Sequence, residues 1–345
     1  MKRFLSGIII VFVFFSLSAQ NKIDSLYIRL AAAHSQEKVN ILNDISYEFR
    51  KTDCEKSLNF ARQALDLSEK IKYKKGIASA YFKIGLYYFN TQSYDQAIQF
   101  YQRSNELYRQ LGDKENIAHS YDRIGLSYMH LSDFEKGTEN IAKAIELLET
   151  LDEEKTLSFC YNNISQALSR LSRYDEALDY LHKALALKQK MQKEGAPDTD
   201  LSIATTFSNI GVILLRTRDF TRALEYFFLA DDIRRKYRTN KEDYILEDGN
   251  LLNNIGITYQ QMKDYDKGLE YQLQALEIYR KEKKTDQIAT ALNNIGYVYD
   301  MKKDWWTCLQ YYLESLKLKI EVGDNYGIAN CAKNVGSIYL EVDDL

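Results

Sequence analysis

Asparagine recurs at one fixed place in five successive segments of the sequence, and this row of side-chain amides could bind a ligand. The row consists of Asn163, Asn209, Asn254, Asn294 and Asn334, and three of these are preceded by another asparagine, at Asn162, Asn253 and Asn293. Asparagine has only middling helix propensity, so its recurrence inside helical segments needs a reason. An amide donates and accepts hydrogen bonds at once, so a row of amides could bind a peptide main chain regardless of its sequence.

Basic residues extend the same pattern. Arg123 occupies the asparagine position in an earlier segment, and Arg170, Arg216 and Gln261 follow the asparagines by seven residues. Seven residues are close to two helical turns, so these side chains belong to one stripe of each helix. Guanidinium groups there could bind acidic side chains or a carboxylate. A second interpretation remains open, in which the asparagines bond between neighbouring helices and set their packing, and both roles could hold together.

Trp306 is a candidate interface residue. Trp305 fills an aromatic position that recurs along the chain, whereas Trp306 stands where other segments carry an acid on the exposed side. Tryptophan is enriched at protein interfaces. Packing of the indole on a neighbouring helix is the alternative interpretation.

Residues for catalysis or metal binding do not form a recognisable constellation. None of the four histidines lies in H-E-x-x-H or beside a cysteine at ligand spacing. The sequence contains no G-x-S-x-G, no G-x-G-x-x-G and no phosphate-binding glycine loop. We therefore expect no enzymatic activity, no metal and no cofactor. The four cysteines are too few for a disulfide framework, although a Cys308–Cys331 bridge could form in an oxidising compartment.

The elements that position the asparagines repeat along the chain. Two residues after each asparagine position stands a glycine or serine, at Ser46, Gly85, Gly125, Ser165, Gly211, Gly256, Gly296 and Gly336. The gaps are 39, 40, 40, 46, 45, 40 and 40 residues, which is the mark of a repeat array. A bulky residue four positions before this glycine slot and an aromatic or leucine three positions after it share one helix face.

A second helix completes each repeat. We expect the glycine slot to let this helix approach closely, through a small residue twelve positions later: Ala97, Gly137, Ala177, Ala223, Gly268 or Cys308. A short polar turn separates the two helices, and an acid often stands in the first turn of the second helix, where the helix dipole favours it.

These motifs resemble the tetratricopeptide repeat. The pattern bulky–x2–hydrophobic–Gly–x2–Tyr, followed by Ala–x3–aromatic, covers residues 38–345. The resemblance implies an all-α fold, a right-handed solenoid of antiparallel helix pairs whose first helices line a concave groove that binds extended peptides. The period is near 40 residues rather than 34, and the proline that usually ends the second helix is missing, so we expect longer second helices.

The predicted organisation has three parts. Residues 1–20 read as a signal peptide, with Lys2 and Arg3 before a short apolar run and small residues near Ala19; an uncleaved anchor is the alternative. Residues 21–36 form a lead-in helix, and residues 37–345 form seven full repeats and a truncated eighth. The longer linkers at 191–200 and 237–248 are surface loops or contacts to a partner. Because the last repeat lacks its second helix, we expect a fragment of a longer product.

The predicted function is that of a non-catalytic, exported scaffold, located in the periplasm or on the outer face of the inner membrane. It would hold an extended segment of a protein or peptide partner in the groove. The net charge of −3 gives no case for nucleic-acid binding. Alternatively, the chain resembles the periplasmic sensor half of Bacteroidetes-type membrane-bound regulators, whose kinase, cyclase or transcription-regulator domain would follow a missing membrane segment. The oligomeric state is not specified.

Overall fold

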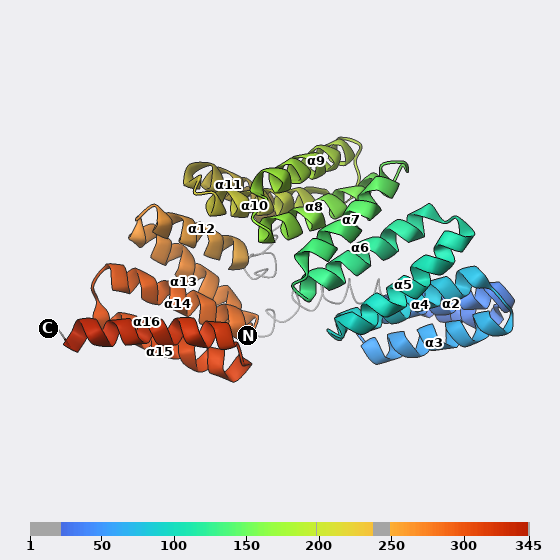
Figure 1. The fold of residues 1–345 in the computed structure, drawn as a ribbon, viewed down its shortest axis with the longest axis horizontal. Helices are drawn as coiled ribbons and strands as arrows, with labels where there is room; N and C mark the ends of the chain where they lie inside the picture. The colour runs from blue at the N-terminus through green and yellow to red at the C-terminus, as the bar shows by residue number, and fades with distance from the viewer. Residues whose placement is uncertain (1–21, 198, 237–248, 344–345) are drawn as a thin grey trace, which may run out of the picture. The chain divides into compact units, whose positions relative to one another are not determined.

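The computed structural model describes residues 22–197, 199–236 and 249–343, and every regular element in them is an α-helix (Figure 1). A helix over residues 22–32 comes first, within the predicted lead-in segment. The all-α architecture of packed helix pairs agrees with the predicted fold class. The predicted signal peptide and the 237–248 linker lie outside the described residues, while the 191–200 linker contains the end of one helix and the start of the next.

Each repeat contributes a first helix, which carries the glycine slot, and a second helix. The first helices are α2 (Ser35–Phe49), α4 (Lys74–Asn90), α6 (Lys114–His130), α8 (Glu154–Arg170), α10 (Thr199–Arg216), α12 (Gly249–Gln261), α14 (Thr285–Met301) and α16 (Asn325–Asp343). The second helices are α3 (Cys54–Lys70), α5 (Tyr94–Leu111), α7 (Phe134–Leu148), α9 (Tyr174–Lys193), α11 (Phe220–Lys236), α13 (Tyr265–Lys281) and α15 (Trp305–Val322).

The turn from first to second helix has the same form in six repeats, from α4–α5 to α14–α15. Its central residue adopts the left-handed conformation seven positions after the glycine slot, at Gln92, Ser132, Ser172, Arg218, Lys263 and Lys303. In several repeats the next residue is an aspartate whose carboxylate accepts a backbone N–H of the following helix, as Asp133, Asp264 and Asp304 do. These N-caps satisfy donors that a helix start leaves unpaired. The acids expected inside the first turn, such as Asp266, lie just beyond them.

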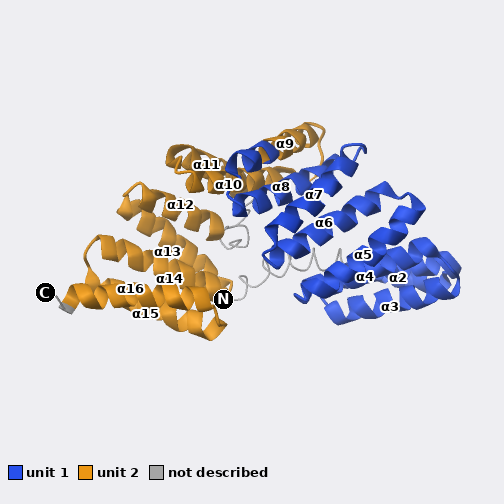
Figure 2. Cartoon of the chain, viewed as in Figure 1, with its two compact units in different colours: residues 1–180 blue, residues 181–345 orange. Residues whose placement is uncertain are grey.

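The chain divides into two compact units, residues 1–180 and 181–345 (Figure 2). In unit 1, α2 to α8 pack in sequence, and the first helices α2 and α4 also contact each other directly. In unit 2 the same pattern runs from α10 to α16, with α12 against α14. The apolar core of each unit lies between the helices of successive pairs; one example joins Leu86, Ala97, Tyr101 and Ile124.

The glycine slots bring the two helices of a repeat into close contact. A Cβ added to Gly125 would lie 2.9 Å from the carbonyl oxygen of Gly137, and one on Gly256 would lie 3.1 Å from that of Gly268. Here the small residue twelve positions later takes part, as expected. In other repeats an aromatic ring sixteen positions after the glycine covers the slot, a role that the sequence interpretation missed: Tyr101 over Gly85, Phe227 over Gly211 and Tyr312 over Gly296.

The last slot differs from the others. No described atom lies within 4 Å of a Cβ added to Gly336. None of the helices in the described part of the chain has the length and apolarity that a membrane crossing needs.

Candidate functional site

The asparagine row of unit 2 forms hydrogen bonds between successive first helices. The Asn294 Nδ2 on α14 donates to the Asn253 Oδ1 on α12 at 3.1 Å, and the Asn334 Nδ2 on α16 donates to the Asn293 Oδ1 on α14 at 3.0 Å. Asn294 and Asn334 therefore each reach the residue that precedes the row position in the first helix before them. We call this set of side chains, Asn253, Asn293, Asn294 and Asn334, the amide ladder.

Buried polar side chains support the amide ladder from the second helix and from the end of the first. The Gln272 Nε2 donates to the Asn253 carbonyl oxygen at 3.1 Å, and the Gln260 Nε2 donates to the Asn294 carbonyl oxygen at 3.4 Å. The Cys331 thiol donates to the Asn293 Oδ1 at 3.6 Å. The sequence interpretation missed both glutamines, although Gln272 stands sixteen positions after a glycine slot, where most other repeats carry an aromatic or aliphatic residue.

Unit 1 builds one step of the same type with a carboxylate. The Asn163 Nδ2 on α8 donates to the Asp122 Oδ1 on α6 at 2.8 Å, and the Cys160 thiol donates to the same oxygen at 3.6 Å. The Arg123 Nε lies 3.8 Å from the other carboxylate oxygen, Asp122 Oδ2. Asp122 thus anchors two of the predicted site residues, and it was not recognised from the sequence.

These bonds give Asn163, Asn294 and Asn334 a packing role, but each bond uses the Nδ2 group only. Each is half-buried, and within the described residues its Oδ1 accepts no hydrogen bond. Asn209 and Asn254 are also half-buried on their first helices. Asn162 is buried, and its Nδ2 donates to the Ser158 carbonyl oxygen one turn earlier.

The predicted basic residues lie at two depths. Arg123 is half-buried in mid-helix, whereas Arg170 and Arg216 are exposed at the last positions of α8 and α10. The Arg170 guanidinium carbon stands 5.9 Å from the centre of the Phe134 ring. Trp306 is 73% exposed in the first turn of α15, while Trp305 beside it packs on the core cluster of Cys308, Tyr312 and Ile338.

The described residues include no group of three His, Cys, Asp or Glu side chains that could hold a metal ion. All four cysteines are free, so the Cys308–Cys331 bridge is not formed; the Cys331 Sγ lies 3.2 Å from the Ser315 Oγ instead. Burial raises the pKa of the Cys308 thiol to about 12, which leaves it protonated and unreactive at neutral pH.

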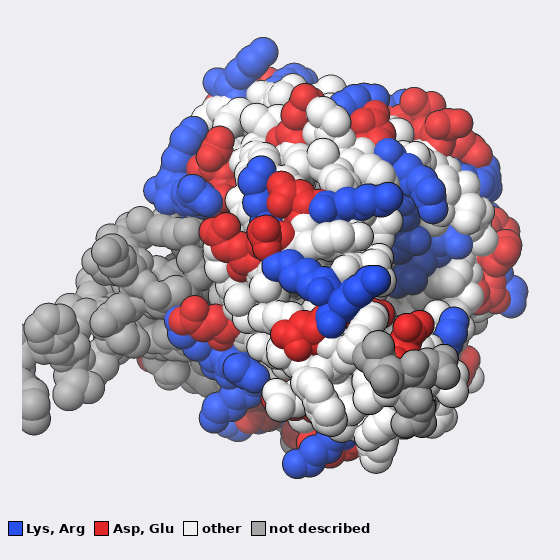
Figure 3. Space-filling view, turned by 90° about the vertical axis from the view of Figure 1, so that its left-hand side faces the viewer, with Lys and Arg blue, Asp and Glu red and all other residues white. Residues whose placement is uncertain are grey.

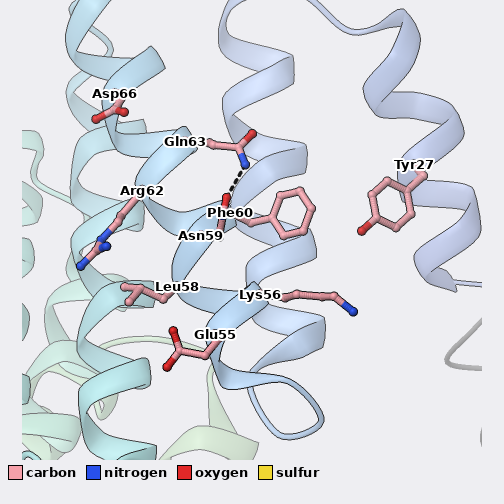
Figure 4. A pocket seen from close by; sticks show the side chains of 9 residues that line it. All are labelled: Tyr27, Glu55, Lys56, Leu58, Asn59, Phe60, Arg62, Gln63 and Asp66. Atoms are coloured by element: carbon pink, nitrogen blue, oxygen red, sulfur yellow. Dashed lines mark hydrogen bonds between the residues drawn. The ribbon is translucent and has the colours of Figure 1, made fainter.

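Charges of both signs are interspersed on the surface in the view of Figure 3. A shallow pocket between the helix over residues 22–32 and α3 shows the same mixture (Figure 4). Its wall includes Glu55 and Asp66 as well as Lys56 and Arg62. Such a wall favours neither anions nor cations.

Comparison with known proteins gives a family match. Two family models described as "Tetratricopeptide repeat" match the chain, one at residues 115–190 and 247–321 and the other at residues 78–111. Together they cover more than half of the sequence. No curated protein sequence matches the chain.

Solved structures resemble the chain in fold. The apo form of RapI gives a TM-score of 0.65 at 14% identity, over 84% of this chain and 100% of RapI. A Rap protein complexed with Competence and Sporulation Factor gives 0.53 at 14% identity, over 95% and 99% of the two chains. The STAND protein PH0952 from Pyrococcus horikoshii, which has a tetratricopeptide repeat sensor, gives 0.65 at 16% identity, over 95% of this chain and 51% of that protein.

Proposed function

Because the chain belongs to the tetratricopeptide repeat family, we propose that it is a non-catalytic scaffold that binds a protein or peptide partner along its first helices. The observation that carries the proposal is the row of half-buried amides on the first helices. In three of them, Asn163, Asn294 and Asn334, the Oδ1 accepts no hydrogen bond from the described residues. The Rap protein complexed with Competence and Sporulation Factor, which is similar in fold, supports a binding role of this kind.

In the proposed mechanism, an extended segment lies across the first helices within one unit and pairs its main-chain groups with the asparagines of that unit. Asn294 and Asn334 each give one N–H to the preceding first helix and keep the second N–H and the carbonyl oxygen for the ligand. Because these partners are backbone groups, they set the register and direction of the segment rather than its sequence. Side-chain selection falls to Arg123, Arg170 and Arg216, which favour acidic residues.

Export is a further part of the proposal, and it rests on the charged start, apolar run and small residues within residues 1–20. Expression in a Gram-negative host followed by fractionation and mass measurement tests it. The expected product is periplasmic and shortened near Ala19. A full-length product that stays in the cytoplasm would contradict export.

The peptide-binding proposal can be tested by panning a displayed library of random linear peptides against the full chain. Peptides that it enriches should lose binding to the triple variant Asn209→Ala, Asn254→Ala and Asn294→Ala, while the far-UV circular dichroism of the variant stays that of the parent. Asn254→Ala alone is the cleanest single change, because Asn254 is not part of the amide ladder. Absence of enriched peptides, or unchanged binding by the triple variant, would refute the proposed groove.

A second candidate function is the sensor region of a larger regulator. PH0952, which is similar over 95% of this chain, is described as having a tetratricopeptide repeat sensor, and this chain spans about half of that protein. Sequencing the gene beyond the codon for Leu345 tests this alternative. An apolar span of about 20 residues followed by a kinase, cyclase or DNA-binding domain would establish it.

A further inference from the structure

Unit 1 contains a pocket with a volume of about 500 Å³ on three of its first helices, α2, α4 and α6. It is bounded by Tyr47, Arg50 and Lys51 at the end of α2, by residues of α4 and by residues of α6. Only Tyr108, from α5, comes from a second helix. This volume is in the range of small-molecule sites.

The wall of this pocket carries charge of one sign. Arg50, Lys51, Lys83 and Arg123 line it together with His119, and among the described residues no aspartate or glutamate lines it. The other lining side chains are aromatic, aliphatic or neutral polar, among them Phe82 and Phe89. The pocket of Figure 4 in the same unit, with two acids and two bases in its wall, provides an internal contrast.

Two of the cations share one aromatic ring. The Arg50 guanidinium carbon lies 3.6 Å and the Lys83 Nζ lies 4.4 Å from the centre of the Tyr47 ring. The Arg50 guanidinium donates to the Tyr47 carbonyl oxygen, and the Asn90 Nδ2 donates to the Arg50 carbonyl oxygen at 2.7 Å, so the end of α2 is held in place. The ring attracts both cations, but it does not neutralise either of them.

Lys83 has no counter-charge in direct contact. Within the described residues its ammonium group forms no ion pair, and Asp44 and Glu48 act on it only from beyond hydrogen-bond distance. Burial lowers the pKa of Lys83 to about 8, and the Arg50 charge adds to this effect against the opposing attraction of Asp44. Lys319 in unit 2 shows the opposite arrangement: its Nζ lies 2.7 Å from Asp286 and 2.8 Å from Asp324.

The bond that joins Asn294 to Asn253 in unit 2 has no counterpart at the equivalent positions of α2 and α4. Lys83 stands two residues before its glycine slot, like Asn294, and Asn43 stands three residues before its slot, like Asn253. Asn43 is buried, yet within the described residues neither its Oδ1 nor its Nδ2 has a hydrogen-bond partner. The chain therefore places an unpaired lysine where an asparagine would complete a bond to a buried amide.

We infer that this basic pocket of unit 1 is a binding site for a phosphoryl group. The cations converge from three helices, α2, α4 and α6, and a compact dianion with three terminal oxygens can accept from several directions at once. A single carboxylate offers two oxygens and one charge. Tyr47, Phe82 and Phe89 provide an apolar wall beside the cations, which fits an organic phosphate better than the free ion.

In the bound state, Arg50, Lys83 and Arg123 donate to the phosphoryl oxygens, and the dianion relieves the repulsion between the first two cations. The ligand is the phosphoryl group of a small organic phosphate or of a phosphorylated side chain. The phosphoryl site does not depend on the proposed peptide capture by the asparagines. Of the residues named for the two sites, they have Arg123 in common.

Calorimetric titration of the full chain tests the inference with phenyl phosphate, inorganic phosphate, a phosphotyrosine peptide and benzoate. Saturable binding of phenyl phosphate is expected, and a weakening of about tenfold or more in Lys83→Asn. The control Lys56→Gln changes a lysine of the mixed-charge pocket and should bind as the parent does. Tighter binding of the phosphopeptide than of phenyl phosphate assigns a phosphorylated side chain as the source, and the reverse assigns a small organic phosphate.

Three results would overturn the phosphoryl site: no saturable binding of any phosphate, equal binding by Lys83→Asn and the parent, or benzoate binding as tightly as phenyl phosphate. Proton uptake provides a second readout. Near pH 8 the bound dianion should draw a proton onto Lys83, so the binding enthalpy should vary with the ionisation enthalpy of the buffer, and Lys83→Asn should lose this uptake. Asn294→Ala, a change in unit 2, should retain phosphate binding even where peptide capture is lost.

Discussion

The two units place different side chains at equivalent positions of their first helices. In unit 2 the position two residues before the glycine slot carries Asn294, which bonds to Asn253 on the preceding first helix. In unit 1 the equivalent pair is Lys83 and Asn43, and no bond joins them. The glycine slots beside these pairs are nevertheless alike, because Tyr101 covers Gly85 as Tyr312 covers Gly296.

The difference shows that packing and polar chemistry are separable in this repeat. A tyrosine ring of the second helix covers the glycine slot in both cases, whether the adjacent polar position is satisfied or not. Where the polar position is satisfied, it contributes to stability. Where it is not, as at Lys83, it leaves charge available for a ligand at a cost to stability.

The largest expected effect concerns the shared packing. A Cβ on Gly85 would lie 2.6 Å from the Tyr101 ring and one on Gly296 would lie 2.7 Å from the Tyr312 ring, both too close for an ordinary contact. Gly85→Ala and Gly296→Ala should therefore each destabilise the fold by about 2 kcal/mol. Denaturant unfolding measures this, with hydrogen exchange of α4 and α14 to locate the loss.

Gly336→Ala is the matched control for these two variants. Its added Cβ meets no described atom within 4 Å, so the gain in helix propensity should make it neutral or slightly stabilising. A cost in Gly296→Ala but not in Gly85→Ala would mean that the two units do not share the same packing.

The next effect concerns the amide ladder. Asn294→Ala removes the donor to the Asn253 Oδ1, and the fold should lose about 1 to 2 kcal/mol. Lys83→Ala in unit 1 removes no hydrogen bond and should cost less. The two denaturation midpoints give the comparison. If Asn294→Ala and Lys83→Ala lose the same free energy of unfolding, the hydrogen bond between Asn294 and Asn253 makes no net contribution to stability.

A gain in stability is expected from the reverse exchange. Lys83→Asn removes a half-buried, unpaired ammonium and introduces the ladder donor opposite Asn43, so unfolding should become harder by about 1 kcal/mol. Thermal unfolding of the parent and the variant in phosphate-free buffer provides the measurement. A lower melting temperature in Lys83→Asn would show that the interrupted ladder position cannot accept an amide.

A further expected effect is a pH dependence. Lys83 has a pKa of about 8 in the folded chain, below the ordinary lysine value of about 10.4, so between these values the unfolded state binds more protons. Stability should be constant with respect to this group below pH 8 and should rise with pH from there to about 10.4. Lys83→Asn should remove this part of the rise.

Lys188 in unit 2 provides the reference for that measurement. Burial lowers its pKa to about 8 as well, but its Nζ donates to the Thr206 Oγ1 at 2.8 Å. The part of the pH dependence of stability that comes from Lys188 should therefore remain in the Lys83→Asn variant. Hydrogen exchange at α4 and at α10 across the pH range separates the two lysines, and an unchanged response at α4 in the variant would contradict the assignment to Lys83.

Most of the fold could be predicted from the sequence because its determinants are local and repeated. The glycine slot, the aromatic residue three positions later and the small residue twelve positions later lie within one repeat, and their recurrence reveals the helix pair. The side chain sixteen positions later that covers the slot was missed, since tyrosine, isoleucine, phenylalanine and glutamine all occupy this position and no single residue type recurs.

The candidate site could be predicted only in part. The sequence indicated which asparagines form a row, but the partner of each lies about one period away on another helix, as Asp122 does for Asn163 at a separation of 41 residues. Whether an amide faces a partner, solvent or a pocket depends on how neighbouring helices are aligned. No pattern within a single repeat carries that information.

By itself, the sequence determined the helix pairs and their order, because the apolar residues of each repeat are buried when its two helices pair and pack on the neighbouring repeat. Tertiary structure alone decided the state of the polar positions. It joined Asn294 to Asn253, left Asn43 without a hydrogen-bond partner among the described residues, and brought Arg50, Lys83 and Arg123 from three helices to one pocket. The physical reason is that hydrogen bonds and charges act over a few ångströms, so their effect depends on contacts between repeats.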